Sequence, residues 1–109
     1  MKYLVYASEG PSFRSTEEML PVLERIVLPG LEALAHLETG KTILAGGLPV
    51  GERALAFIIE APSNEELDTM LQKIPLWSLL AWEVTPLQSF RNRAEHERAF
   101  LASIKKTRA

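Results

Sequence analysis

A single carboxylate, Glu83, lies within the apolar segment from Ile74 to Leu87. Side chains of a strand alternate between its two faces, so Glu83 is expected to point away from its bulky neighbours Trp82 and Val84. Burial disfavours the charged form of a carboxyl group, and a buried Glu83 could therefore act as a general acid or base near neutral pH. The alternative is a structural carboxylate that pairs with an arginine or lysine, or that lies near a solvated strand end.

Five other side chains are candidates for contacts with a small molecule. The Tyr6 phenol could donate a hydrogen bond to a substrate carbonyl, and Arg14 could bind a substrate carboxylate through two parallel hydrogen bonds. His36 could move a proton, and Trp77 and Trp82 could stack on a planar ligand. The structural alternative makes Tyr6 and the two tryptophans packing residues, with Arg14 and His36 on the solvated surface.

Composition excludes several classes of protein. The chain has 109 residues and a formal net charge of -2, with two histidines and no cysteine. One hydrophobic core is expected at this length, and the charge gives no support for nucleic-acid binding. Disulfides and thiolate catalysis are excluded, and two histidines without suitably spaced carboxylates do not predict a metal site. No apolar run reaches the roughly 20 residues of a membrane-spanning helix, so we expect a cytoplasmic protein without a metal or organic cofactor.

The predicted elements alternate between strands and helices. Capping boxes at Ser15 and Ser63 predict the starts of two helices, which are expected to end near Gly40 and Pro75. The first helix is expected to be kinked at Pro29. Four segments rich in apolar residues are predicted as strands, at residues 2–8, 42–48, 54–60 and 79–87.

This order predicts an α+β fold of the ferredoxin-like βαββαβ type, an antiparallel four-stranded sheet with two helices on one face. Residues 1–88 would form that domain, and residues 89–109 a C-terminal helical extension. The strands are apolar on both faces, although two helices can cover only one of them. We expect a second copy of the chain to cover the other face, in a homodimer that could assemble further.

The second half of the chain resembles muconolactone isomerase-like proteins. The resemblance is carried by Ala61-Pro-Ser-Asn-Glu-Glu-Leu67, by the Pro75-Leu76-Trp77 linker and by Glu83-Val84. It implies a dimeric α+β barrel. It also implies an isomerase that moves a proton on a small unsaturated lactone without a metal or organic cofactor.

We therefore expect a small, planar metabolite to bind in a cavity between the sheet and the helices, with Glu83 as acid–base group and Tyr6 orienting the substrate. A cofactor-free oxygenase reaction would use the same cavity. The competing hypothesis is a non-catalytic assembly or partner-binding module, in which Glu83 is ion-paired, no pocket exists and the tail from Arg91 to Arg108 wraps a neighbour.

Overall fold

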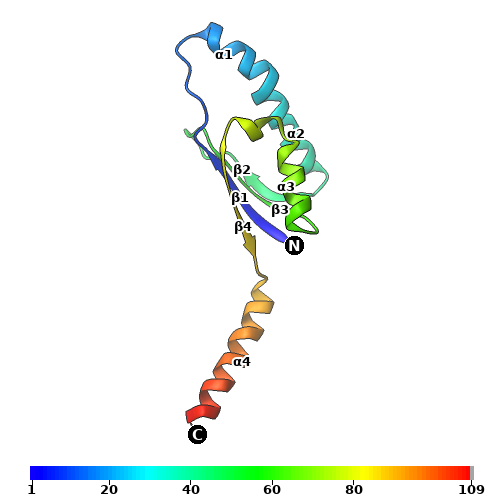
Figure 1. The fold of residues 1–109 in the computed structure, drawn as a ribbon, viewed down its shortest axis with the longest axis vertical. Helices are drawn as coiled ribbons and strands as arrows, with labels where there is room; N and C mark the ends of the chain where they lie inside the picture. Colours follow the sequence, from blue (N-terminus) through cyan, green and yellow to red (C-terminus); the bar gives the residue numbers. More distant parts are fainter. Residues whose placement is uncertain (109) are drawn as a thin grey trace.

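The structure, a computed structural model, describes residues 1–108 and has the predicted βαββαβ order followed by a C-terminal helix (Figure 1). Two short segments, the π-helix η1 and the 3₁₀-helix η2, add to the predicted elements. The elements are β1 (Lys2–Ser8), α1 (Thr16–Val22), η1 (Leu23–Val27), α2 (Leu28–Thr39), β2 (Ile43–Gly47), β3 (Leu55–Glu60), α3 (Asn64–Gln72), η2 (Pro75–Ser78), β4 (Ala81–Leu87) and α4 (Phe90–Arg108).

The sheet has the strand order β2-β3-β1-β4, and every neighbouring pair is antiparallel. One face packs against α2, α3 and η2, and this covered face holds the core. Along β1 the residues Tyr3, Val5 and Ala7 are buried on the covered face, whereas Leu4 and Tyr6 lie on the other, which we call the open face. The fold class predicted from the sequence is thus confirmed.

Both capping boxes begin helices where they were predicted. The Ser15 hydroxyl accepts a hydrogen bond of 3.2 Å from the backbone N–H of Glu18 at the start of α1. The Ser63 hydroxyl accepts the same bond, also 3.2 Å long, from Glu66 at the start of α3. Each cap satisfies one of the N–H groups that a helix N-terminus leaves without an intrahelical partner.

The first helix changes from an α-helix to a π-helix just before Pro29 and then continues as an α-helix. At η1 the backbone adopts a π-helical turn, in which the N–H of Leu28 donates to the carbonyl of Leu23, five residues earlier. Proline lacks an N–H and its ring crowds the preceding turn, and the wider π turn accommodates it while α2 continues. Gly30 follows at the closest approach of α2 to η2, where an added Cβ would overlap the side chain of Leu76.

The chain just before β4 differs in detail from the prediction. The predicted linker Pro75-Leu76-Trp77 is a 3₁₀ turn, and the backbone N–H of Leu79 closes it by donating to the carbonyl of Leu76 at 3.1 Å. Because Leu79 is engaged in that turn, β4 begins at Ala81 rather than at residue 79.

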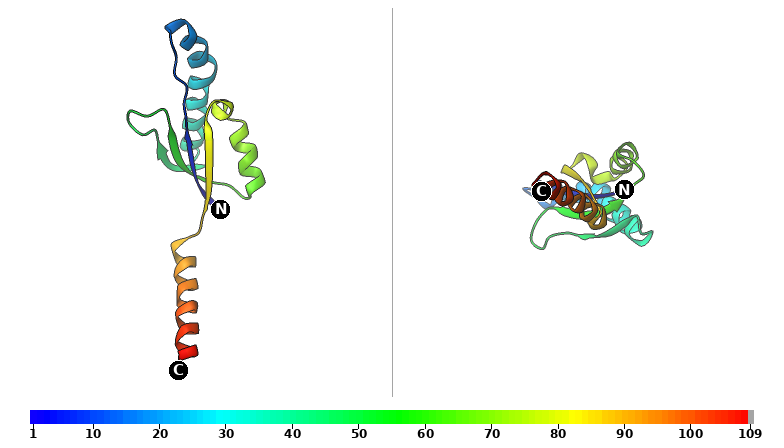
Figure 2. Two further views of the ribbon diagram at one scale, coloured as in Figure 1. Left: turned by 60° about the vertical axis from the view of Figure 1, so that its left-hand side comes forward. Right: turned by 90° about the horizontal axis from the view of Figure 1, so that it is seen from below.

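The helix α4 extends away from the rest of the molecule (Figures 1 and 2). All of its 19 residues are exposed, and the molecule is 73 Å long as a result. No helix of residues 1–108 is both long enough and apolar enough to cross a membrane.

Candidate functional site

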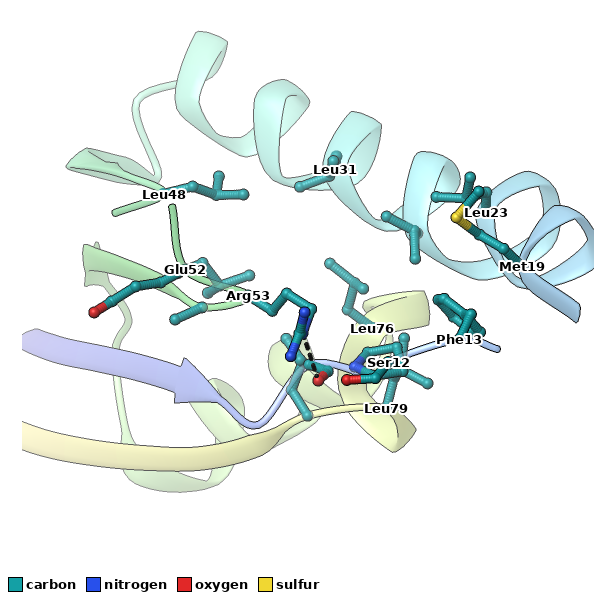
Figure 3. Close-up of a pocket in the computed structure, with 16 residues that line it drawn as sticks. Ser12, Phe13, Met19, Leu23, Leu31, Leu48, Glu52, Arg53, Leu76 and Leu79 are labelled. Atoms are coloured by element: carbon teal, nitrogen blue, oxygen red, sulfur yellow. Dashed lines mark hydrogen bonds between the residues drawn. The ribbon is translucent and has the colours of Figure 1, made fainter. Parts of the chain in front are cut away.

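A cavity of about 510 Å³ opens on the covered side of the sheet, beyond the C-terminal end of β1. Its walls come from the loop Gly10–Phe13, the first helix, the β2–β3 hairpin and η2 (Figure 3). Most of the lining is apolar and includes Met19, Leu23, Leu31, Leu48, Leu76 and Leu79. Such a space suits a small apolar or planar molecule, because pockets of this size bury most of a small ligand.

Arg53 is the cationic side chain in the wall of this cavity. Its Nε–H donates to the carbonyl of Gly10 at 3.2 Å, and the Gly10 N–H donates to the Arg53 carbonyl at 3.1 Å (Figure 3). A Cβ at Gly10 would lie 2.6 Å from the Arg53 Cβ, so this close approach requires glycine. The two bonds fasten the loop after β1 to the start of β3 and use only one of the five guanidinium donors.

Glu52 also lines the cavity, through the stem of its side chain. Figure 3 shows its carboxylate directed away from the Arg53 guanidinium. Within residues 1–108 the carboxylate has neither an ion-pair nor a hydrogen-bond partner. The Glu52 side chain is exposed.

A second, more polar hollow of about 330 Å³ lies next to the first. Its walls include Tyr6 and Ser8 of β1, and four residues line both hollows: Gly10, Glu52, Arg53 and Ala54. Arg53 therefore lies between an apolar compartment on the covered side and a polar one that reaches Tyr6.

Glu83 lies opposite Tyr6 in the β1–β4 register, so the two candidates share the open face. Their position away from the helices agrees with the strand alternation used above. Glu83 is exposed, however, and it belongs to neither hollow. The expected cavity between sheet and helices is present, but Glu83 is not in its wall, and the catalytic role of Glu83 and Tyr6 stays a prediction.

The tryptophans pack on each other. Their ring centroids are 5.5 Å apart, and the Trp82 Nε1–H donates to the Trp77 carbonyl at 3.1 Å. Both rings are half-buried against the core and lie outside the cavity lining. This geometry indicates packing, which was the structural alternative for both residues.

Arg14 and His36 are exposed and do not line the cavity. Arg14 follows Phe13, which lines the cavity. The backbone N–H of Arg14, rather than its guanidinium, donates a hydrogen bond of 3.2 Å to the Glu18 carboxylate. His36 lies near the C-terminal end of α2, where its carbonyl accepts from Gly40. The residues brought together at the cavity are instead Arg53, Glu52 and Ser12.

Arg53 was not predicted as a site residue from the sequence, because it lies in the connection between the predicted strands 42–48 and 54–60. One signal was available: in an antiparallel sheet, the residue after β1 and the residue before β3 meet at the same edge. Gly10, two residues after β1, and Arg53, two residues before β3, lie at that edge.

The family model of muconolactone delta-isomerase matches residues 33–93, more than half of the chain. The chain belongs to this family. The match includes the sheet strands β2, β3 and β4, together with α3 and the Pro75-Leu76-Trp77 turn, and it confirms the resemblance noted in the sequence. It ends at the first turn of α4.

Two solved structures have the same fold as this chain. The crystal structure of muconolactone isomerase superposes with a TM-score of 0.66 at 20% identity, and covers 82% of this chain and 90% of its own. A second is 5-chloro-2-hydroxyhydroquinone dehydrochlorinase from Burkholderia phenoliruptrix AC1100, in complex with 2,5-dihydroxybenzoquinone. Its TM-score is 0.60 at 21% identity, with 84% of this chain and 98% of that chain covered. No curated protein matches the sequence.

Proposed function

We propose that this protein is a cofactor-independent isomerase that moves a proton on a small unsaturated lactone or a related planar, oxygenated compound. The observation that carries the proposal is the apolar cavity of about 510 Å³ with the Arg53 guanidinium in its wall. Membership of the muconolactone delta-isomerase family supports the reaction class. The planar, oxygenated ring bound by the dehydrochlorinase of the same fold supports the ligand class.

Arg53 would stabilise negative charge on the substrate oxygen. When a base removes a proton from the carbon next to a lactone carbonyl, the C–H electrons move toward the oxygen and form an enolate. The protonated base then returns the proton to another carbon of the conjugated system, so that only a double bond changes place. A cation beside the oxygen lowers the energy of that intermediate, and the bond to the Gly10 carbonyl would hold the exposed guanidinium at the edge of the cavity.

For the base we propose Glu52. Its stem lines the cavity and its carboxylate is unpaired within residues 1–108, so rotation of the side chain would bring it to the cavity mouth. Glu83, with Tyr6 orienting the substrate, is the rival candidate. It would require a substrate held against the open face, because Glu83 lies across the sheet from the cavity.

We also propose a homodimer through the open face. Its centre is apolar, with Leu4, Tyr6 and Ile58, and its rim is polar, with Glu60 and Glu83. An apolar centre with a polar rim is typical of protein interfaces. A monomer in sedimentation at micromolar concentration would refute this assembly.

The binding site is tested with two arginine variants in the same part of the molecule. We expect Arg53→Gln to weaken binding of 2,5-dihydroxybenzoquinone by at least about tenfold, as expected for loss of one charge-assisted hydrogen-bonding group. Arg14→Gln is the matched control and should bind as the unmodified protein does. Equal affinities for both variants, measured by absorbance titration, would contradict the assignment.

The base is tested with two glutamate variants and muconolactone as the probe substrate. Glu52→Gln should lower kcat by about 100-fold or more, the usual contribution of a general base, while Glu83→Gln should not. The reverse result would move the site to the open face. Undiminished activity in both variants would refute both candidates for the base, and absence of activity in the unmodified protein would favour the non-catalytic module.

A further inference from the structure

Four apolar side chains form a row along the first helix, on the side that faces the cavity. They are Met19, Leu23, Val27 and Leu31, each four residues after the last, and all four line the cavity. Figure 3 shows Leu31, Leu23 and Met19 following one another along the helix. At a rise of about 1.5 Å per residue the row is roughly 18 Å long. A single ring is much shorter, so it would leave most of the row without a partner.

The π-helical turn keeps this row in line. Four residues are slightly more than one turn of an α-helix, so a row at this spacing would gradually move round a regular helix and away from the cavity. The segment η1 is π-helical, and its wider turn holds more residues. It offsets the drift midway along the row, between Leu23 and Val27. The irregular backbone before Pro29 thus maintains an elongated apolar wall.

The cavity is larger than a small oxygenated ring requires. Its volume is about 510 Å³, whereas a dry cavity of about 150 Å³ already accommodates benzene. Thirteen of its sixteen lining residues are apolar or glycine, so the additional space is apolar too. A ring such as 2,5-dihydroxybenzoquinone, the ligand in the dehydrochlorinase structure, has no apolar substituent that could fill it.

The polar side chains of the cavity are gathered at its edge. Ser12, Glu52 and Arg53 are exposed, whereas Leu55 and Leu76 are buried. The Arg53 guanidinium keeps donors beyond the one that bonds within the chain. A ligand that matches this distribution has its oxygens at one end and an apolar group at the other.

We propose that the substrate of this site is a planar, oxygenated ring that carries an unbranched alkyl chain. An oxygen of the ring would accept hydrogen bonds from Arg53, and the chain would lie along the row from Leu31 to Met19. The inference rests on the proposed function, because it places the reacting ring beside Arg53. It adds an occupant for the rest of the cavity. Each buried methylene removes apolar surface from water and so favours binding.

An alkyl chain fits this space better than a protein segment does. A helix with its side chains is about 10 Å across, so a length of about 18 Å would occupy roughly 1,400 Å³. The cavity has about a third of that volume. A protein segment would also offer no oxygenated group of its own to the single guanidinium in the wall. A slim chain that ends in such a group meets both conditions.

A series of 2,5-dihydroxybenzoquinones with one ring substituent of increasing length tests the proposal. The substituents are hydrogen, methyl, propyl and hexyl, and the affinities are measured by absorbance titration. A fully buried methylene strengthens binding by up to about fourfold. The hexyl compound should therefore bind at least about 100-fold more tightly than the unsubstituted ring. Equal affinities across the series would overturn the proposal, since the row would then take no part in binding.

Two leucines of the first helix show where the chain lies. Leu23→Gln places an amide in the row, where the chain would deprive it of water. The ratio of hexyl to unsubstituted affinity should therefore fall by about tenfold or more. Leu28→Gln is the matched control, because Leu28 is 55% exposed and does not line the cavity, and the ratio should stay as in the unmodified protein. Equal ratios in the two variants would contradict this placement of the chain.

The Arg53→Gln variant separates this inference from the proposed function. It should weaken the unsubstituted and hexyl compounds by the same factor, because it acts on the ring alone. If the unsubstituted ring binds and the chain adds nothing, the alkyl substrate is refuted and the proposed function stands. A gain from the chain without any effect of Arg53→Gln would refute the role of Arg53 and leave the chain in the row. No binding of any member would overturn both.

Octanoate tests whether the ring is needed. It has the chain and an anionic group but no ring, and it should bind at least about tenfold more weakly than the hexyl compound, because it lacks the apolar faces of the ring. Equal affinity would show that the site recognises a fatty acid, which would contradict a ring-bearing substrate.

Discussion

The strand β1 contributes one tyrosine to each face of the sheet, and the two tyrosines show how the faces differ. Tyr3, on the covered face, is 1% exposed, and its hydroxyl donates to Asn64 Oδ1 at 2.6 Å. Tyr6, three residues later, is half-buried on the open face opposite Glu83. Residue type and strand are the same for both. The covering helices alone make one tyrosine part of the core and leave the other available for contacts.

The same difference separates the two candidate sites. On the covered side, apolar walls already enclose a cavity beside Arg53. On the open side, the Glu83 carboxylate stays hydrated unless a second sheet covers it. Electrostatic effects on a reaction are strongest where water is excluded. One chain already gives the covered side a cavity with apolar walls, although Arg53 and Glu52 are exposed at its edge, whereas the open side would gain a second wall only in an assembly.

The largest expected difference between the faces concerns adjacent isoleucines of β3. Ile59 is fully buried on the covered face, and Ile59→Ala should cost about 2–5 kcal/mol of unfolding free energy at any protein concentration. Ile58→Ala, on the open face, should cost less, with a loss that depends on protein concentration because the residue is expected to act through the dimer. Denaturant unfolding at two protein concentrations measures both. If both variants lost the same unfolding free energy at both protein concentrations, the two faces of the sheet would not differ in this respect.

A smaller effect is expected from added methyl groups at two glycines. Gly30→Ala introduces a Cβ that overlaps Leu76, so the variant should lose about 1–3 kcal/mol through overpacking. Gly47→Ala adds a Cβ with no atom within 4 Å and should be nearly neutral. Thermal unfolding of the two variants, side by side, tests whether α2 and η2 are in close contact. Equal midpoints would indicate that they are not.

The smallest effect is expected at the tyrosines themselves. Tyr3→Phe removes the bond to Asn64 and should cost about 0.5–1.5 kcal/mol. Tyr6→Phe removes no side-chain hydrogen bond formed within residues 1–108 and should change stability by less than about 0.5 kcal/mol. Chemical denaturation gives both values, and a larger loss at Tyr6 would show that its hydroxyl is engaged on the open face.

Some features of the fold could be predicted because they depend on neighbours in sequence. Each capping box joins a serine, Ser15 or Ser63, to the residue three positions later. In any strand consecutive side chains point to opposite faces, which separates Glu83 from Trp82. The family resemblance came from another contiguous stretch, residues 61–84. The π turn at η1 was not predicted, because the sequence shows the obstruction at Pro29 but not which adjustment of the backbone accommodates it.

The cavity depends on contacts distant in sequence, and the sequence did not predict the residues that line it. Arg53 gains its position from Gly10, 43 residues earlier, through two hydrogen bonds and a close approach that only glycine allows. Glu83 was the unusual charge in its own segment, yet the cavity formed elsewhere.

The sequence by itself determined the order of elements, the family and the position of Glu83 on the opposite side of its strand from Trp82, because caps, alternation and contiguous motifs are local properties of the chain. The tertiary structure decided which face encloses a cavity and which arginine lines it. Burial and pairing of side chains depend on segments that only the folded chain brings together, as Gly10 and Arg53 do.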